Sequence, residues 1–174
     1  LAAIRRVVDL GVDHLELRLF GDGPARNKVE RLIDEYRLRD RTQLFGMRHD
    51  IDYNVREFDI FVLASYREGR PTSIMEAMAS GVPVIATRVG AVSELVQHNR
   101  TGLLVEPDDV ESLAESIRLL VIDISMRQRF AHESRQIAER ELSLESMAQE
   151  YGTFYRSIVE SKPRERKAHS ICCL

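Results

Sequence analysis

Short apolar runs alternate with longer amphipathic segments along most of the chain. Residues 15–20 alternate apolar with polar side chains, which predicts a strand, and residues 43–45 predict another short strand. The run at 60–64 is apolar throughout, as expected for a strand that is covered on both faces of a sheet. The runs at 82–86 and 103–105 also have the length and composition of strands. We therefore expect a sheet of short strands separated by longer segments.

The segments between and after these strands carry apolar residues at helical spacing. In residues 110–121, for example, Leu113, Ile117 and Leu120 lie on one face. The spacing predicts a helix just before residue 82 and further helices over 1–10, 25–36, 50–58, 94–97, 110–121, 124–138 and 144–159. Alternating strands and helices predict an α/β fold, a Rossmann-like open parallel sheet with helices on both faces and right-handed crossovers.

The last predicted helix, residues 144–159, has an unusually apolar stripe. Its members are Met147, Tyr151, Phe154, Tyr155 and Ile158. A stripe of this kind is expected to be covered. We expect contacts with the rest of the chain through Met147, Tyr151 and Phe154, together with some apolar surface that stays exposed.

Composition and charge exclude several classes of protein. The chain has 174 residues, enough for one domain with a substantial core, and a net charge of −3, which gives no reason to expect nucleic acid as a partner. No apolar run approaches the roughly 18 residues that a membrane span needs. The only cysteines, Cys172 and Cys173, are adjacent, so they predict neither a disulfide framework nor a metal site, and a reducing cytoplasm is the simplest setting. Residues 161–174 show no periodicity and predict a mobile basic tail, for which solvation explains the sequence better than palmitoylation.

The richest chemistry lies in residues 67–87, REGRPTSIMEAMASGVPVIAT, where a loop and a helix join two predicted strands. Ligands of such sheets lie at the carboxyl ends of the strands. Gly69 lets a backbone approach a ligand closely, and Pro71 suits the first turn of a helix. The free amides around Thr72 and Ser73 would then attract an anion.

Two glutamates complete this stretch. Glu68 and Glu76 are separated by seven residues, and their carboxylates can accept hydrogen bonds from hydroxyls. A molecule with sugar hydroxyls beside phosphates fits this set of groups. A simpler interpretation stays open, because Ser73-x-x-Glu76 is also a capping box and Glu68 could be a solvated loop charge.

Other candidate sites have simpler explanations. Asp50 and Asp52 have the D-x-D spacing of some metal-dependent glycosyltransferases, but a helix cap explains them better. His49 lies in a loop predicted near the ligand, yet it has no partner at catalytic spacing, so a solvated loop histidine is the better interpretation. We therefore expect no metal site.

Residues 65–87 resemble the signature of retaining glycosyltransferases of family four, S-x-x-E-G-x-P-x-x-x-x-E-A-M-A-x-G-x-P-V-I-A-T. Residues 19–24 are similar to the G-D-G-P turn of that family. Residues 44–46, followed by Asp50, and the segment 101–109 also occur in the order of the family. The resemblance covers about residues 15–158, nearly the whole chain.

This resemblance implies a donor-binding domain of the GT-B fold and a role for each matching residue. Glu68 would be the catalytic residue and would hold hydroxyls of the donor hexose with the backbone of Gly69, Arg70 and Pro71. The amides near Thr72 and Ser73 would bind the diphosphate, Glu76 the ribose, and the loop of Gly46, Met47 and Arg48 the base. The substrate would be a nucleoside-diphosphate sugar, with no cofactor. One departure is Arg70, at a position that is usually apolar or aromatic in the family.

The resemblance also implies an incomplete enzyme. Residues 1–160 would be the C-terminal half without its first, central strand, and residues 161–174 a tail. The partner would be an N-terminal Rossmann domain that carries the acceptor site, and through it the enzyme could associate with the inner face of the membrane. Transfer of a hexose to a glycan, lipid or other hydroxyl acceptor, as in polysaccharide biosynthesis, is then expected of the full-length protein but not of this chain alone. An inactive nucleotide-sugar-binding module and an epimerase-like enzyme of the same fold remain alternatives.

Overall fold

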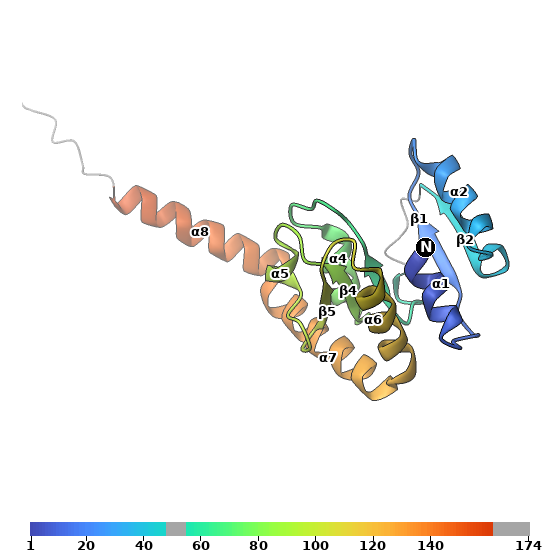
Figure 1. Ribbon diagram of the computed structural model, residues 1–174. Coiled ribbons are helices and arrows are strands. Elements are labelled where there is room, and N and C mark those ends of the chain that lie inside the picture. Colours follow the sequence, from blue (N-terminus) through green and yellow to red (C-terminus); the bar gives the residue numbers. More distant parts are fainter. Residues whose placement is uncertain (48–54, 162–174) are drawn as a thin grey trace, which may run out of the picture.

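The computed structural model describes residues 1–47 and 55–161, which form an α/β structure (Figure 1). Its strands are β1 (Leu17–Phe20), β2 (Thr42–Gly46), β3 (Phe61–Leu63), β4 (Val84–Thr87) and β5 (Gly102–Val105). Its helices are α1 (Ala2–Asp9), α2 (Arg26–Glu35), a 3-10 turn (Arg39–Arg41), α4 (Thr72–Ala79), α5 (Val92–Leu95), α6 (Val110–Ile122), α7 (Ile124–Glu141) and α8 (Leu144–Ser161). Strands and helices alternate as predicted, and the boundaries differ by only a few residues.

The strands form two separate parallel sheets, β1–β2 and β3–β4–β5. In the first sheet Leu19 lies opposite Leu44, and in the second Val62 lies opposite Ile85. Every strand pair is parallel, so the prediction of a parallel sheet is confirmed. Within the described residues β1 and β3 each pair along one edge only.

Helix starts and stops follow local chemistry. The side chain of Asp109 caps α6 by accepting a hydrogen bond of 2.9 Å from the Ser112 amide. Asp123 caps α7 in the same way, with 2.8 Å to the Met126 amide. Gly11 follows α1 with a φ of +88°, a conformation that favours glycine and ends the helix.

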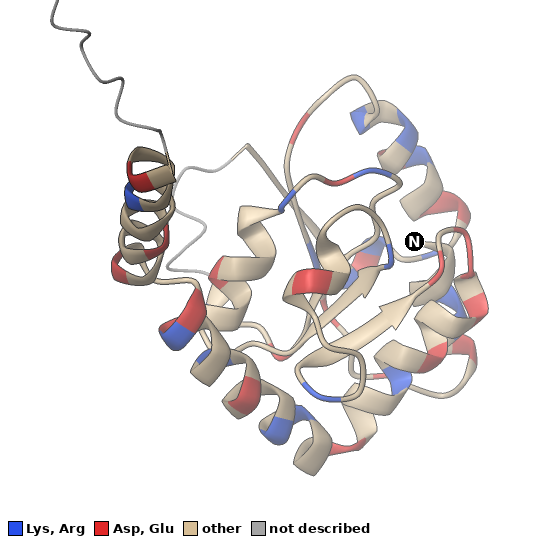
Figure 2. Cartoon of the chain, turned by 90° about the vertical axis from the view of Figure 1, so that its left-hand side faces the viewer, with Lys and Arg blue, Asp and Glu red and all other residues tan. Residues whose placement is uncertain are grey.

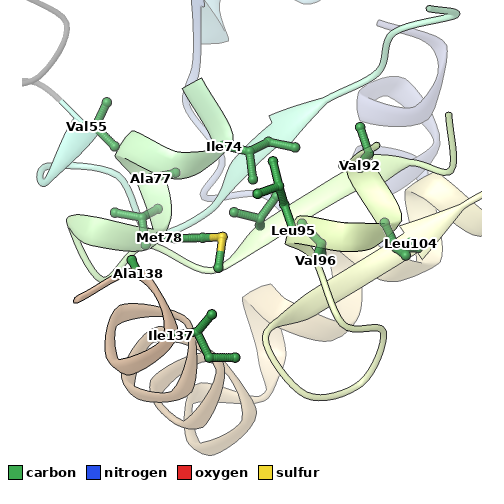
Figure 3. Packing of buried hydrophobic residues seen from close by; sticks show 13 residues of the cluster. Val55, Ile74, Ala77, Met78, Val92, Leu95, Val96, Leu104, Ile137 and Ala138 are labelled. Carbon is green, nitrogen blue, oxygen red and sulfur yellow. The ribbon is translucent and has the colours of Figure 1, made fainter. Parts of the chain in front are cut away.

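Helices on both sides of β4 build two clusters of buried residues, and Figure 3 shows the first of them. Helix α4 packs on β3 and β4, whereas α6 packs on β4 and β5. On the α4 side, Ile74 and Met78 belong to one cluster with Ile137 of α7. On the other side, Ile85 and Phe130 join Ile33 of α2 in a second cluster that links the two sheets. All residues of β4 and β5 are buried as a result.

Strand β3 departs from the prediction that both of its faces are covered. Val62, at its centre, is 39% exposed. The reason is that α4 covers one face of β3, while α6 packs on β4 and β5 instead. The apolar run at residues 60–64 therefore predicted the strand correctly, but the prediction that both of its faces are covered is wrong.

Helix α8 projects away from the rest of the chain (Figure 1) and has no buried residue. The expected packing through Met147, Tyr151 and Phe154 is wrong, because these side chains are 48%, 56% and 59% exposed. The expectation of exposed apolar surface is confirmed. Neighbouring rings on α8 contact one another instead, with the centroids of Tyr151 and Tyr155 6.2 Å apart.

Several predicted features lie outside the described residues. They are most of the helix expected over 50–58, the D-x-D pair Asp50 and Asp52, His49, and nearly all of the tail 161–174 with its two cysteines. None of the helices built by residues 1–47 and 55–161 is both long enough and apolar enough for a membrane span.

Candidate functional site

The loop between β3 and α4, residues 64–71, stands at the carboxyl end of a parallel strand, where the sequence placed it. We call it the β3–α4 loop. Glu68 is half-buried, whereas Gly69 and Arg70 are exposed, so a ligand could reach the backbone of the loop. Arg70 departs from the family pattern and places an exposed, charged side chain here instead of an apolar or aromatic one.

The loop enters α4 through Pro71, which is buried and is the N-cap of the helix with φ −69° and ψ 116°. Pro71 was expected within the first turn, but it immediately precedes that turn, which begins at Thr72. The amides of Thr72 and Ser73 have no partner within the helix by its geometry and carry the positive end of its dipole. This helix start can attract an anion.

The helix start bears on the capping-box interpretation of Glu76. A capping box needs Ser73 at the N-cap, but the N-cap of α4 is Pro71 and Ser73 is the second residue of the helix. The capping-box interpretation therefore does not fit the structure. Glu76 is half-buried on α4, one helical turn beyond the start.

A cavity of about 220 Å³ adjoins the β3–α4 loop on the side of Tyr66. Ser65, Thr87, Asp108 and the start of α1 also line it. The Tyr66 hydroxyl donates a hydrogen bond to the Asp108 carboxylate, which raises the pKa of Tyr66 above its ordinary value. Neither Glu68 nor Glu76 lines this cavity. The cavity therefore lies beside the β3–α4 loop and does not contain the two carboxylates.

The residues expected near a base come from the other sheet. Gly46 ends β2 with a φ of +66°, and Met47 is 64% exposed. The ring of Phe45 stacks on Phe20 at the end of β1, with centroids 4.8 Å apart. Arg48, the third predicted member of this group, lies outside the described residues. The structure thus brings Glu68 through Glu76 together in one loop and helix, while Gly46 and Met47 belong to a separate sheet.

Two residues that no sequence pattern singled out, Thr87 and Gly90, contact the β3–α4 loop directly. Thr87 donates a hydrogen bond of 2.5 Å to the Ser65 carbonyl oxygen. Gly90 has a φ of +51° and lies against the Glu68 backbone. A glycine shortly after a predicted strand was the available signal, but its neighbour across the fold is visible only in three dimensions.

Acidic and basic side chains are interleaved along the helices (Figure 2). Many of them pair on the surface, as Arg135 does with Glu139 at 2.8 Å and Arg88 with Glu106 at 3.0 Å. Such exposed pairs contribute little stability each. Within residues 1–47 and 55–161, no group of three or more His, Cys, Asp or Glu side chains is arranged to hold a metal ion.

Comparison with known proteins gives a consistent result. Residues 1–137 match the protein family described as "Glycosyl transferases group 1". The chain is 29% identical over 144 residues to N-acetyl-alpha-D-glucosaminyl L-malate synthase of Bacillus anthracis, which covers 83% of this chain and 38% of that protein.

Solved structures agree with this match. Sucrose-phosphate synthase from Thermosynechococcus elongatus superposes with a TM-score of 0.80 at 28% identity, over 92% of this chain and 42% of that protein. HepE from Anabaena, solved in complex with UDP, superposes with a TM-score of 0.81 at 25% identity, over 89% of this chain and 44% of that one. The chain spans about two fifths of the length of these relatives.

Proposed function

The chain belongs to the glycosyl transferases group 1 family, and from this premise we propose that it is the donor-binding half of a retaining glycosyltransferase of family four. The fold would be GT-B and this chain its C-terminal half. The full-length enzyme would move a hexose from a nucleoside-diphosphate sugar to a hydroxyl of a glycan, lipid or other acceptor, in polysaccharide biosynthesis.

The observation that carries this proposal is the arrangement of the β3–α4 loop and the start of α4. Within nine residues the chain presents the Glu68 carboxylate, the exposed backbone of Gly69, a helix N-terminus at Thr72 and the carboxylate of Glu76. Carboxylates accept hydrogen bonds from sugar hydroxyls, and helix N-termini attract phosphates. The solved complex of HepE with UDP supports a nucleotide ligand for this fold.

The proposed roles follow from these positions. Glu68 and the backbone of Gly69, Arg70 and Pro71 hold the hexose, and Glu76 holds the ribose. The amides of Thr72 and Ser73 face the diphosphate. Negative charge grows on the diphosphate as the glycosidic bond breaks, so preorganised donors there lower the barrier; removing one comparable donor in other enzymes costs about 3–4 kcal/mol. Gly46, Met47 and Arg48 would lie against the base.

The exposed face of α8 supports the proposal that the full-length enzyme has a second domain. The rings of Tyr151, Phe154 and Tyr155 are more than half exposed, which is unusual for a helix with such a stripe. We propose that an N-terminal Rossmann domain with the acceptor site covers this face. Closure of the two halves would exclude water from the donor and prevent its hydrolysis. We place the enzyme in the cytoplasm, with the second half allowing contact with the inner face of the membrane.

A scan of nucleotide sugars tests the proposal. The full-length protein is incubated with UDP-, GDP- and ADP-sugars, and its melting temperature is recorded. Stabilisation by one class of donor is expected, because a ligand that binds only the folded state raises the melting temperature. The preferred donor is then offered with acceptor sugars, and NMR reads the anomeric configuration of the product.

Each result has a distinct meaning. Transfer with retained configuration supports the proposal in full. Donor binding without any transfer favours an inactive nucleotide-sugar-binding module, and conversion of the free nucleotide sugar favours an epimerase-like enzyme. A protein that no nucleotide sugar stabilises would contradict all three.

A further inference from the structure

The segment after β4 makes contacts that the proposed donor-binding roles leave unused. Thr87 ends β4, and residues 88–91, which we call the β4–α5 loop, lead to α5. This segment lies directly against the β3–α4 loop through Thr87, Gly90 and Ala91. The inference below rests on the proposed function, because that function places the β3–α4 loop on the donor.

Two hydrogen bonds join the loops at their ends. The buried Thr87 hydroxyl donates to the Ser65 carbonyl oxygen at 2.5 Å. The Ala91 amide donates to the Gly69 carbonyl oxygen at 3.1 Å. Both ends of the segment 65–69 are therefore held from the same side, by the strand end and loop that follow in the chain.

Between these bonds, Gly90 lies against the Glu68 peptide group. A Cβ atom built on Gly90 would lie 1.8 Å from the Glu68 carbonyl oxygen and 2.9 Å from its carbonyl carbon. Real Cβ atoms do not approach backbone atoms so closely, so any side chain at position 90 would push the two loops apart. The φ of +51° at Gly90 adds a second reason for glycine.

These contacts fix the direction of two amides. The N–H and C=O groups of a trans peptide point in opposite directions, and the described residues contain no cis peptide bond. The Glu68 and Gly69 carbonyls face the β4–α5 loop, so the amides of Gly69 and Arg70 point away from it. Neither amide donates to an acceptor among residues 1–47 and 55–161.

We propose that Gly90, with Thr87 and Ala91, is a positioning element for the donor loop. By donating hydrogen bonds to the Ser65 and Gly69 carbonyls and packing against the Glu68 carbonyl, it turns the Gly69 and Arg70 amides toward the ligand, next to the start of α4. Two successive backbone donors suit oxygen-rich ligands, namely the hydroxyls of a hexose and the adjoining phosphate. Gly90 touches no reacting atom in this proposal and acts through the loop.

The central variant is Gly90→Ala, and Gly81→Ala is its matched control. Gly81 follows α4 with a φ of +71°, but a Cβ there would meet its nearest atoms only at 3.8 Å. The control therefore carries the strain of a positive φ without a collision. Affinities for UDP and UDP-glucose are measured by calorimetry on the full-length protein. Deuterium exchange of the Ala91 amide, which donates to the Gly69 carbonyl oxygen, is measured beside them.

Gly90→Ala is expected to lower the affinity for UDP-glucose by about tenfold or more, because a small misplacement of binding groups has large effects. The affinity for UDP, which lacks the hexose, falls less, and exchange of the Ala91 amide becomes faster. Gly81→Ala leaves the ratio of the two affinities and the exchange of the Ala91 amide unchanged. Equal behaviour of the two variants, or faster exchange with an unchanged affinity ratio, would overturn the proposal.

A second pair of variants covers the case in which Gly90→Ala does not fold. Thr87→Val keeps the shape of the side chain but removes the hydroxyl, whereas Thr87→Ser restores it. The affinity ratio should shift in Thr87→Val and return in Thr87→Ser; the same ratio in both would contradict the proposal. If the wild-type protein binds neither probe, that failure counts against the donor function, while the exchange comparison still decides whether Gly90 holds the loop.

Discussion

Helices α6 and α8 carry apolar stripes of similar spacing, but only one stripe is covered. On α6, Ala114, Ile117 and Leu120 are buried against the sheet and its neighbouring helices. On α8 no residue is buried, although the helix is longer and its stripe contains three aromatic rings. The difference shows that amphipathic spacing predicts a helix with one apolar face. The spacing does not predict which part of the protein, if any, packs on that face.

The two helices therefore contribute differently to the free energy of folding. Burying a large apolar side chain contributes about 1.5–3 kcal/mol relative to leaving it exposed. Helix α6 realises this contribution within the described chain, whereas the apolar side chains of α8 do not. Helix α6 therefore supports the stability of the domain, α8 is the interface that we propose, and the following experiments test that distinction.

Within this pair of helices, the larger effect is expected on α6. Leu120→Ala should lower the free energy of unfolding by about 2–5 kcal/mol, because Leu120 is fully buried and its truncation leaves a cavity. Ile122, in the same helix, is 60% exposed, so Ile122→Ala is the control and should cost far less. Urea unfolding measures both. Equal losses would show that burial on α6 does not support the fold as described.

Helix α4 should separate function from stability. Its buried face, with Ile74 and Met78, supports the core, whereas Glu76 is only half-buried. Glu76→Gln keeps the shape but loses the charge-assisted acceptor, so nucleotide affinity should weaken by about 1.5–3 kcal/mol while the melting temperature hardly changes. Calorimetry and thermal unfolding are measured on the full-length protein.

The exposed Glu150 on α8 provides the matched control, because Glu150→Gln removes the same charge away from the loop. That variant should bind nucleotide like the wild type. Unchanged affinity in Glu76→Gln would remove the ribose role of Glu76 and with it much of the argument for a donor site.

The smallest effect is expected on α8 itself. Phe154→Ala should change the free energy of unfolding of the 174-residue chain by no more than about 0.5 kcal/mol, as is usual for exposed positions. Phe130→Ala on α7 removes the same ring from a fully buried position and should cost about 3–5 kcal/mol. A large loss in Phe154→Ala would mean that α8 folds back on the chain in solution, and the contrast with α6 would fail.

Much of the candidate site was accessible to sequence reasoning because it is local. Glu68, Gly69 and Glu76 lie within one strand–loop–helix segment, where spacing alone predicts their relation. The capping interpretation of Glu76 could be judged only once the helix was seen to begin at Thr72 rather than after Ser73. Thr87 and Gly90 were missed because they meet the loop across two strands, and no periodicity reports such a contact.

By itself, the sequence determined the order of strands and helices, their parallel pairing and the loop that carries the candidate chemistry. These properties depend on local spacing, caps and turns, which short segments encode. Only the tertiary structure decided which apolar faces are covered: both sides of β4, one side of β3 and none of α8. The physical reason is that burial depends on which surfaces meet, and helices α4 and α6 overlap over β4 alone, while α8 leaves the body of the chain.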